Sequence, residues 1–152
     1  MKPRAYVASP LGFTESGRHY LVHVLLPALA DVVDPVDPWS FTSAPAVAAA
    51  ERAGRLRELW RETGARNARA IREADLLVAL LDGQEIDSGT AAEVGYAAAL
   101  GRPCFALRSD LRQSGETGMV MNLQLVAFIE ESGGAITASL EELVTQLGER
   151  SA

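Results

Sequence analysis

The chain has little of what disulfide-stapled or membrane-spanning proteins require. Its 152 residues include a single cysteine, Cys104, so no disulfide can form within the chain. No apolar run approaches the length of about 18 residues that a membrane-spanning helix needs. The start at Met1 lacks the charged, apolar and cleavable parts of a signal peptide. We therefore expect a cytoplasmic protein with no membrane partner.

Positive charge is also in short supply. Lys and Arg total 14 against 20 Asp and Glu, which gives a net charge of −6 at pH 7. Nucleic-acid binding relies on a basic patch that neutralises phosphates, so this balance disfavours a nucleic-acid polymer as partner. The arginines between Arg52 and Arg72 alternate with acidic residues, which favours a solvated helix face. The segment Arg108–Arg112, offset by Asp110, is likewise expected to be a solvated loop.

Metal-binding and phosphate-binding motifs are missing as well. His19 and His23 are four residues apart, but no HExxH joins them and no third ligand is near, which favours packing or surface roles. The turn Ser9-Pro10-Leu11-Gly12 lacks the GxGxxG pattern of dinucleotide-binding turns. We therefore expect neither a metal site nor a cofactor.

What the chain does contain is an alternation of strand-like and helix-like segments. The predicted strands are Ala5–Ala8, Ala30–Val33, Ala74–Leu81, Pro103–Leu107 and Ala135–Thr137. The predicted helices are Thr14–Leu29, Ala46–Glu73 with a break near Gly54 or Gly64, a helix opened by Ser88-Gly89-Thr90, Gly118–Glu131, and a last helix that starts with a capping box at Ser139. Such alternation predicts one α/β domain over residues 1–152, with a doubly wound, flavodoxin- or Rossmann-like, mostly parallel sheet of about five strands and helices on both faces.

The most informative segment is Ala74–Arg102. It begins with a continuously apolar run, as expected of a strand buried on both faces, and Asp82-Gly83 then ends that strand. A helix rich in small residues follows. Four carboxylates gather at this strand-to-helix junction, namely Asp82, Glu85, Asp87 and Glu93. Ligands of open α/β sheets bind at this carboxyl edge of the strands, so the junction is a candidate site.

The junction has a structural and a chemical interpretation. In the structural one, Thr90 caps the helix and Glu93 reaches back to its amide in a capping box. In the chemical interpretation, the junction carries more negative charge than one helix cap needs, and Ser88-Gly89 allows a ligand to approach the backbone. Such carboxylates suit a positively charged transition state, as in glycosyl transfer through an oxocarbenium-like centre. Glu93, held on a helix, is then the best-placed nucleophile.

These residues resemble the nucleoside 2-deoxyribosyltransferase family. The matching motifs are Asp82-Gly83, Asp87-Ser88-Gly89-Thr90, Glu93, Gly95-Tyr96-Ala97, Gly101-Arg102-Pro103, Leu107-Arg108-Ser109-Asp110 and Asn122-Leu123-Gln124. The opening Tyr6-Val7-Ala8-Ser9-Pro10-Leu11 is similar to the family's first strand and loop. The resemblance therefore covers nearly the whole chain.

The resemblance implies transfer of a 2-deoxyribosyl group from a deoxynucleoside to another free nucleobase, through a covalent intermediate on Glu93. Tyr6 matches the tyrosine whose hydroxyl orients the nucleophile. Asp87 matches the carboxylate that binds the sugar hydroxyls. Asn122 matches an asparagine that family members insert into a neighbouring subunit's site, which implies a homo-oligomer, at least a dimer, with shared sites.

The chain also departs from the family pattern. Some members place an aspartate far upstream of the nucleophile as general acid, and the equivalent region here offers Asn67, a poorer acid. Relatives that hydrolyse nucleoside 5′-monophosphates carry a small hydroxyl residue where this chain has Asp87, whose charge would repel a phosphate and so favours free nucleosides. The expected substrate-binding residues are Asp87, Gly89, Asn122, Asp82 and Asn67.

Several alternatives stay open at this stage. An N-glycoside hydrolase of nucleosides or nucleoside 5′-monophosphates would use water in place of the second base. A non-catalytic nucleotide-binding module would need no carboxylate at position 93. Neither purine nor pyrimidine preference follows from the motifs.

The aromatic residues of the proline-rich loop and the single cysteine can also be interpreted from the sequence. Trp39 and Phe41, in the proline-rich loop Asp34–Pro45, are either hydrophobic anchors or a stacking lid over a nucleobase. Cys104, flanked by strand residues, is expected in the core rather than as a reactive thiol.

Overall fold

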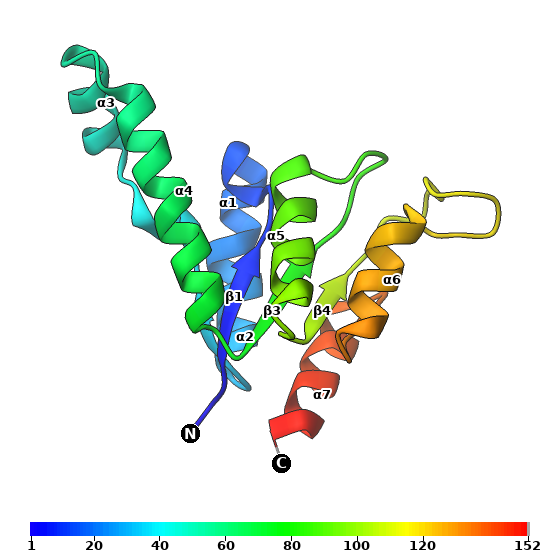
Figure 1. Cartoon of the computed structure of the whole chain (residues 1–152). Helices are drawn as coiled ribbons and strands as arrows, with labels where there is room; N and C mark the ends of the chain where they lie inside the picture. The colour runs from blue at the N-terminus through cyan, green and yellow to red at the C-terminus, as the bar shows by residue number, and fades with distance from the viewer. Residues whose placement is uncertain (152) are drawn as a thin grey trace.

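The computed structural model describes residues 1–151 and contains one five-stranded parallel sheet (Figure 1). Its strands are β1 (Arg4–Ala8), β2 (Asp34–Val36), β3 (Leu76–Leu80), β4 (Cys104–Leu107) and β5 (Ala135–Thr137). They lie in the order β2-β1-β3-β4-β5, and each pairing is parallel. The doubly wound α/β fold expected from the sequence is confirmed. The winding changes direction between β1 and β3, which is where such sheets bind ligands.

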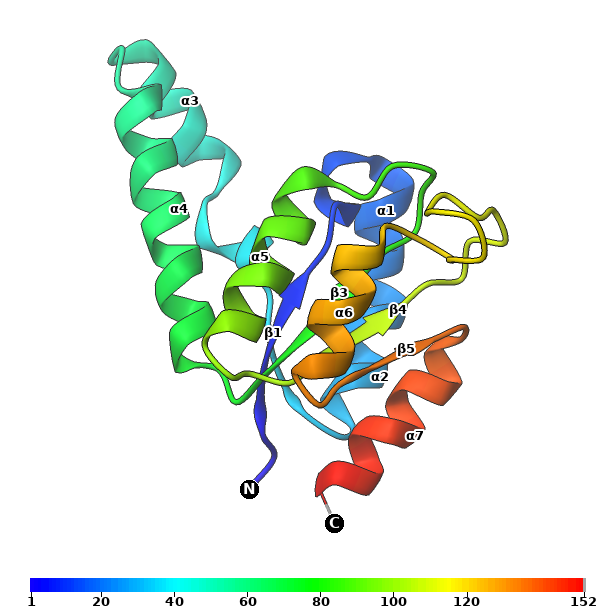
Figure 2. The same ribbon diagram turned by 45° about the vertical axis from the view of Figure 1, so that its right-hand side comes forward.

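Helices cover both faces of this sheet (Figures 1 and 2). One face carries α1 (Glu15–Tyr20), a π-helical turn (Leu21–Leu25), α2 (Leu26–Ala30) and α7 (Leu140–Ser151). The other face carries α4 (Leu56–Glu73), α5 (Ser88–Ala99) and α6 (Leu123–Glu131). None of the helices within residues 1–151 is both long and apolar enough to cross a membrane.

The alternation of side chains along β1 determines what lies beneath α5. Ala5 and Val7 pack with α1, α2 and α7, whereas Tyr6 and Ala8 pack on the opposite side with α4 and α5. All four side chains are fully buried. Tyr6 therefore points toward the helix that carries the carboxylate junction.

Helices α3 (Ala44–Arg52) and α4 form a hairpin that stands out beyond the sheet (Figures 1 and 2). Gly54 turns the chain between them with a φ of 66°, a left-handed conformation that glycine adopts without strain. The expected break thus falls at Gly54, and Gly64 lies inside α4. The base of α4 packs on the sheet through Ala70 and Ile71, which are buried.

Two expected boundaries were wrong. The second strand is Asp34–Val36 rather than Ala30–Val33, because the amides of Val32 and Val33 both donate to the Leu29 carbonyl and continue the end of α2 as a turn. Pro35 fits in β2 because β2 is at the sheet edge. Helix α6 begins at Leu123 rather than Gly118.

The expectation of a solvated loop at Arg108–Arg112 was wrong for Arg108, which is only 6% exposed. Its guanidinium donates to the carbonyls of Leu81 and Gly83, at the end of β3, and to the carbonyl of Arg112 at 2.8 Å. The buried charge therefore ties the segment after β3 to the loop after β4. Cys104, by contrast, is buried as expected, and its burial raises the pKa of the thiol to about 11.

Gly134 gives a direct test of this packing. A Cβ at that position would lie 1.7 Å from the carbonyl oxygen of Cys104, whereas one at Gly64 would meet nothing within 4 Å. We expect Gly134→Ala to lower the free energy of unfolding by at least about 2 kcal/mol through overpacking. Gly64→Ala, the matched control, should raise it by about 0.5–1 kcal/mol because alanine favours a helix interior. Urea unfolding measures both, and equal stabilities would contradict the packing.

Candidate active site

The central contact of the site joins β1 to α5. The Tyr6 hydroxyl donates to Glu93 Oε1 at 2.6 Å. Tyr6 is fully buried in β1, and Glu93 lies one turn into α5 and is partly exposed. A rigid strand and a helix therefore hold the glutamate from two sides, at the carboxyl edge of the sheet.

Asp87 begins α5 and leaves Glu93 available for this contact. Asp87 Oδ2 accepts hydrogen bonds from the Thr90 amide at 2.8 Å and from the Thr90 hydroxyl at 2.9 Å. The structural interpretation, a capping box of Thr90 and Glu93, is thus wrong: Asp87 is the N-cap, and Thr90 is buried as its partner. Because the cap is satisfied by Asp87, the Glu93 carboxylate extends away from the helix end.

The electrostatics of the pair keep the proton on the tyrosine. Burial raises the pKa of the Tyr6 hydroxyl, and the neighbouring Glu93 carboxylate raises it further. Burial also raises the pKa of Glu93, the Tyr6 hydrogen bond opposes this effect, and the Asp87 charge adds to it. The hydroxyl therefore remains a donor, and Glu93 is the group that ionises.

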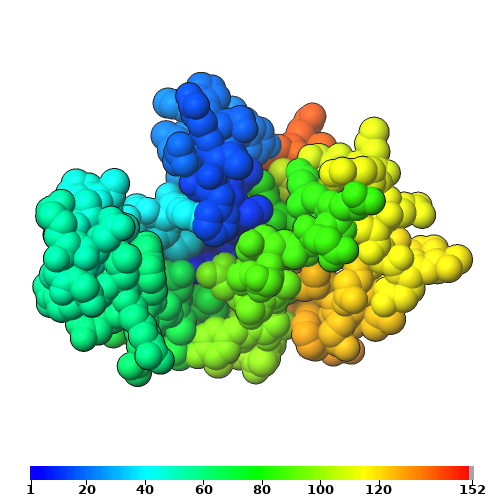
Figure 3. Space-filling view, turned by 90° about the horizontal axis from the view of Figure 1, so that it is seen from above, coloured from blue at the N-terminus to red at the C-terminus, as the bar shows by residue number. Residues whose placement is uncertain are grey.

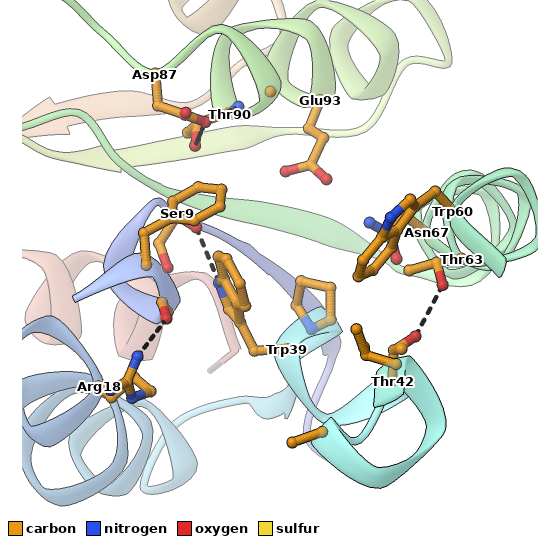
Figure 4. Close-up of a pocket in the computed structure, with 16 residues that line it drawn as sticks. Ser9, Arg18, Trp39, Thr42, Trp60, Thr63, Asn67, Asp87, Thr90 and Glu93 are labelled. Carbon is orange, nitrogen blue, oxygen red and sulfur yellow. Dashed lines mark hydrogen bonds between the residues drawn. The ribbon is translucent and has the colours of Figure 1, made fainter. Parts of the chain in front are cut away.

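A cavity of about 590 Å³ opens above Glu93. Figure 3 looks down on this side, with the hairpin beside the N-terminal segments and α5. In the close-up of Figure 4, Glu93 points into the cavity, Ser9 and Arg18 lie on the α1 side, and Trp60 and Asn67 lie on α4. The cavity is thus bounded by the sheet edge and by the hairpin.

Trp39 forms part of the cavity wall and is held rigidly. Its indole nitrogen donates to the Ser9 carbonyl at 3.0 Å, and its ring meets Phe13 edge-on with centroids 4.7 Å apart. The ring also lies against Gly12, where a Cβ would come within 2.0 Å of it. Phe41 instead packs against the buried core. Trp39 is therefore a wall residue, and Phe41 an anchor.

Several of the expected site residues come together here. The cavity wall includes four of them, Asp87, Gly89, Asn67 and Glu93, with Tyr6 directly behind Glu93. The arrangement places a partly buried carboxylate at the floor of a cavity with aromatic walls. Such a site suits an attack on a polar ligand with a flat ring.

Two expected site residues lie elsewhere. Asp82 accepts from the amides of Ser109 and Asp110, at 2.6 and 2.9 Å, and so helps to join the ends of β3 and β4. Asn122 caps α6 by accepting from the Gln124 amide at 3.0 Å, and it borders a second cavity of about 420 Å³ between α5 and α6. Neither residue lines the cavity above Glu93.

Four further residues that line the cavity were not predicted from the sequence as part of a site, namely Ser9, Arg18, Trp60 and Thr63. Trp60 was detectable in principle, because a tryptophan on an arginine-rich helix, here 50% exposed, is unusual on a purely solvated face. Among the described residues, the buried atoms Ser9 Oγ and Asn67 Oδ1 have no hydrogen-bond partner. Unpartnered polar atoms in a cavity wall are typical of a site that binds a polar ligand.

The histidines form no visible metal site. His19 and His23 lie with ring centroids 4.7 Å apart on the α1 side. Within residues 1–151 no group of three or more His, Cys, Asp or Glu side chains could hold a metal ion.

Comparisons with solved structures find proteins of the same fold. A conserved protein from Enterococcus faecalis V583 is 26% identical over 99% of both chains, with a TM-score of 0.68. A 2-desoxiribosyltransferase from Leishmania mexicana is 24% identical over 99% of both chains, with a TM-score of 0.69. The 2-deoxyribosyltransferase from Bacillus psychrosaccharolyticus is 18% identical over 95% of both chains, with a TM-score of 0.64. No curated protein sequence matches the chain significantly.

A model of one protein family matches most of the chain. The family model described as nucleoside 2-deoxyribosyltransferase matches residues 5–124, a span that runs from the strand of Tyr6 past the helix of Glu93 to the cap of α6. With most of its length matched, the chain belongs to the nucleoside 2-deoxyribosyltransferase family.

Proposed function

We propose that the protein transfers a 2-deoxyribosyl group from a deoxynucleoside to a second nucleobase by double displacement at Glu93. The observation that carries this proposal is the hydrogen bond between Tyr6 and Glu93 at the floor of the cavity. The bond holds one carboxylate oxygen and leaves the other free to attack. It also holds the carboxylate on rigid elements, and such positioning is a large part of the rate in glycosyl transfer.

The two displacements follow from the chemistry of a carboxylate nucleophile. In the first, a Glu93 oxygen bonds to C1′ of the sugar while the bond from C1′ to the base nitrogen breaks, which leaves a glycosyl ester. In the second, a nitrogen of the acceptor base bonds to C1′ and Glu93 leaves as a carboxylate. Configuration at C1′ is retained after two inversions.

Polar and aromatic groups of the cavity support a nucleoside as the ligand. Asp87 lies near the nucleophile and can accept hydrogen bonds from sugar hydroxyls through the oxygen that does not cap α5. Gly89 leaves the backbone open to a close approach. Trp39 and Trp60 supply flat apolar surfaces for a base.

The proposal includes a homo-oligomer in which Asn122 of one subunit completes the site of another. Asn122 lies outside the cavity of its own chain, so a contribution to a site requires a second subunit. The cavity between α5 and α6 is where such a subunit would meet it. We propose the cytoplasm as the location and nucleoside salvage as the role.

Base exchange is the first test. We expect a mixture of one deoxynucleoside and a different free base to yield a new deoxynucleoside, detected by chromatography over a matrix of donors and acceptors. Glu93→Ala should lower this rate by at least about a thousandfold, because it removes the nucleophile. Glu149→Ala, which removes an exposed carboxylate on α7, serves as the control.

The products separate the candidate activities. Release of free base and sugar that added base does not suppress would instead support the hydrolase. A nucleotide-induced rise in melting temperature without turnover of any nucleoside would support the binding module. Full exchange by Glu93→Ala would refute the assignment of the nucleophile.

Trp39 should contribute to binding more than to chemistry. We expect Trp39→Ala to raise KM for nucleosides about tenfold with a smaller change in kcat, since stacking on an aromatic ring is worth about 1–3 kcal/mol per base. Steady-state kinetics give both constants. Phe41→Leu is the contrasting variant and should lower the melting temperature while leaving KM near the wild-type value, because Phe41 packs in the core. An unchanged KM in Trp39→Ala would show that Trp39 is also only an anchor.

The raised pKa of Glu93 has a consequence for stability. Because burial raises this pKa above its ordinary value of 4.5, the ionised carboxylate destabilises the native state at neutral pH, and this cost disappears as pH falls through the native pKa. Glu93→Gln keeps an acceptor for Tyr6 and removes the charge. We expect it to melt at a higher temperature than wild type at pH 7, with the difference vanishing toward pH 4. A difference independent of pH would contradict this account.

A further inference from the structure

The α4 side of the cavity carries an amide where glycosyl transfer usually employs an acid. Retaining transfer between paired carboxyl groups uses one as nucleophile and the other to protonate the leaving group. The hairpin wall that could meet a base presents Trp60, Thr63 and Asn67 (Figure 4). None of these side chains releases a proton near neutral pH.

The ionisable groups of the cavity are engaged elsewhere. Among the described residues that line it, these groups are Arg18, Asp87 and Glu93. Arg18 donates to the Gly12 carbonyl at 3.0 Å, so its guanidinium is directed at the backbone of the first loop. Asp87 accepts from both the amide and the hydroxyl of Thr90 through Oδ2, as the cap of α5, and it lies on the side of the cavity away from α4 (Figure 4).

The remaining hydroxyls near Asn67 are also occupied. Thr63 donates to the Leu59 carbonyl at 2.9 Å and lies 2.8 Å from the Thr42 hydroxyl. Tyr6 donates to Glu93, and burial raises its pKa. Asn67 Oδ1, by contrast, has no hydrogen-bond partner among residues 1–151. The Asn67 amide nitrogen likewise donates to no other described residue, so both ends of this side chain are available to a ligand.

We propose that Asn67 holds the leaving base by neutral hydrogen bonds and that the base departs without a proton from the protein. The inference rests on the proposed function. As Glu93 bonds to C1′, the electron pair of the breaking bond stays on the base nitrogen, and an Asn67 N–H group stabilises the resulting anion. Water then supplies the proton and becomes hydroxide, which later takes the proton that the acceptor base loses. Atoms and charge balance over the two displacements.

This arrangement determines the class of substrate. Without an acid, the barrier to the first displacement depends strongly on how stable the departing base is as an anion. The site therefore favours nucleosides of electron-poor bases, whose N–H groups are acidic, over those of electron-rich bases of the same shape. The site therefore discriminates between nucleosides by how readily the base leaves, more than by the size of the base.

The test uses 2′-deoxyuridines that carry graded substituents at C5, from nitro and halogen to hydrogen and methyl. The donor kcat/KM reports every step up to release of the base, so its logarithm is plotted against the pKa of the free base. We expect a steep negative slope for the wild type. Asn67→Asp places an acid at the same position, so its slope should be shallower, with the methyl compound gaining at least tenfold relative to the nitro compound.

The pH profile gives a second readout, which would not change if Asn67 had only a structural role. The wild-type kcat/KM should rise as Glu93 ionises and then stay level. The charged and titratable groups around Glu93 are Asp87, Arg18 and the Tyr6 hydroxyl, with Asp37 near Tyr6. In Asn67→Asp, kcat/KM should fall again at higher pH, as the introduced carboxyl loses its proton.

Gln113→Glu is the matched control, because it makes the same change of charge in an exposed loop outside the cavity. It should keep both the wild-type slope and the wild-type pH profile. Melting temperatures verify that each variant is folded.

The outcomes distinguish the two proposals. A shallow wild-type slope would show that the protein protonates the leaving base. A wild-type profile that falls at high pH and loses that fall in Asp87→Asn would identify Asp87 as the acid. Either result overturns this inference alone. Wild-type protein that turns over neither these deoxyuridines nor any purine or pyrimidine deoxynucleoside of the donor matrix would overturn the proposed function itself.

Discussion

The hydrogen bond between Tyr6 and Glu93 is the contact on which the arrangement of the site depends. It links Tyr6, the first of the two β1 residues that face α5, to a glutamate one turn into that helix. It requires that the helix be capped by Asp87, since a Glu93 drawn back to its own helix end would not reach the tyrosine. It also requires a fixed path between β3 and α5, which Arg108 secures through the carbonyls of Leu81 and Gly83. A buried arginine and a helix cap thus contribute to the position of one carboxylate.

The sheet was predictable from the sequence because its central strands are continuous apolar runs, as in β3, and such runs have few alternatives in an α/β chain. The edge strand was not. Val32 and Val33 look like a strand, but the Leu29 carbonyl takes their amides, and the strand itself contains Pro35. The role of Arg108 was equally hidden, since its partners are backbone carbonyls that no side-chain pattern reveals.

The candidate site was likewise predictable from the sequence only in part. Asp87 and Glu93 follow one strand directly, so their place at the sheet edge could be inferred from local sequence. Ser9 could not, and Trp60 was recognisable only as unusual on its helix, because the two face one cavity only when the hairpin and the first loop come together in space. Asn122 lies outside this cavity, and its proposed part depends on a second chain, which one sequence does not describe.

The α3–α4 hairpin has a consequence for how such an enzyme changes over evolution. The groups proposed to act on the sugar lie on the central sheet and the start of α5. Two of the residues proposed to meet the base, Trp60 and Asn67, lie instead on α4 of the hairpin, whose two helices pack on each other. Insertions, deletions or tilts of the hairpin would reshape the part of the cavity that it contributes to the base, and would leave the part that holds the sugar unchanged. A lineage could therefore acquire new nucleobases by remodelling a peripheral appendage, while the reaction centre stays under separate selection.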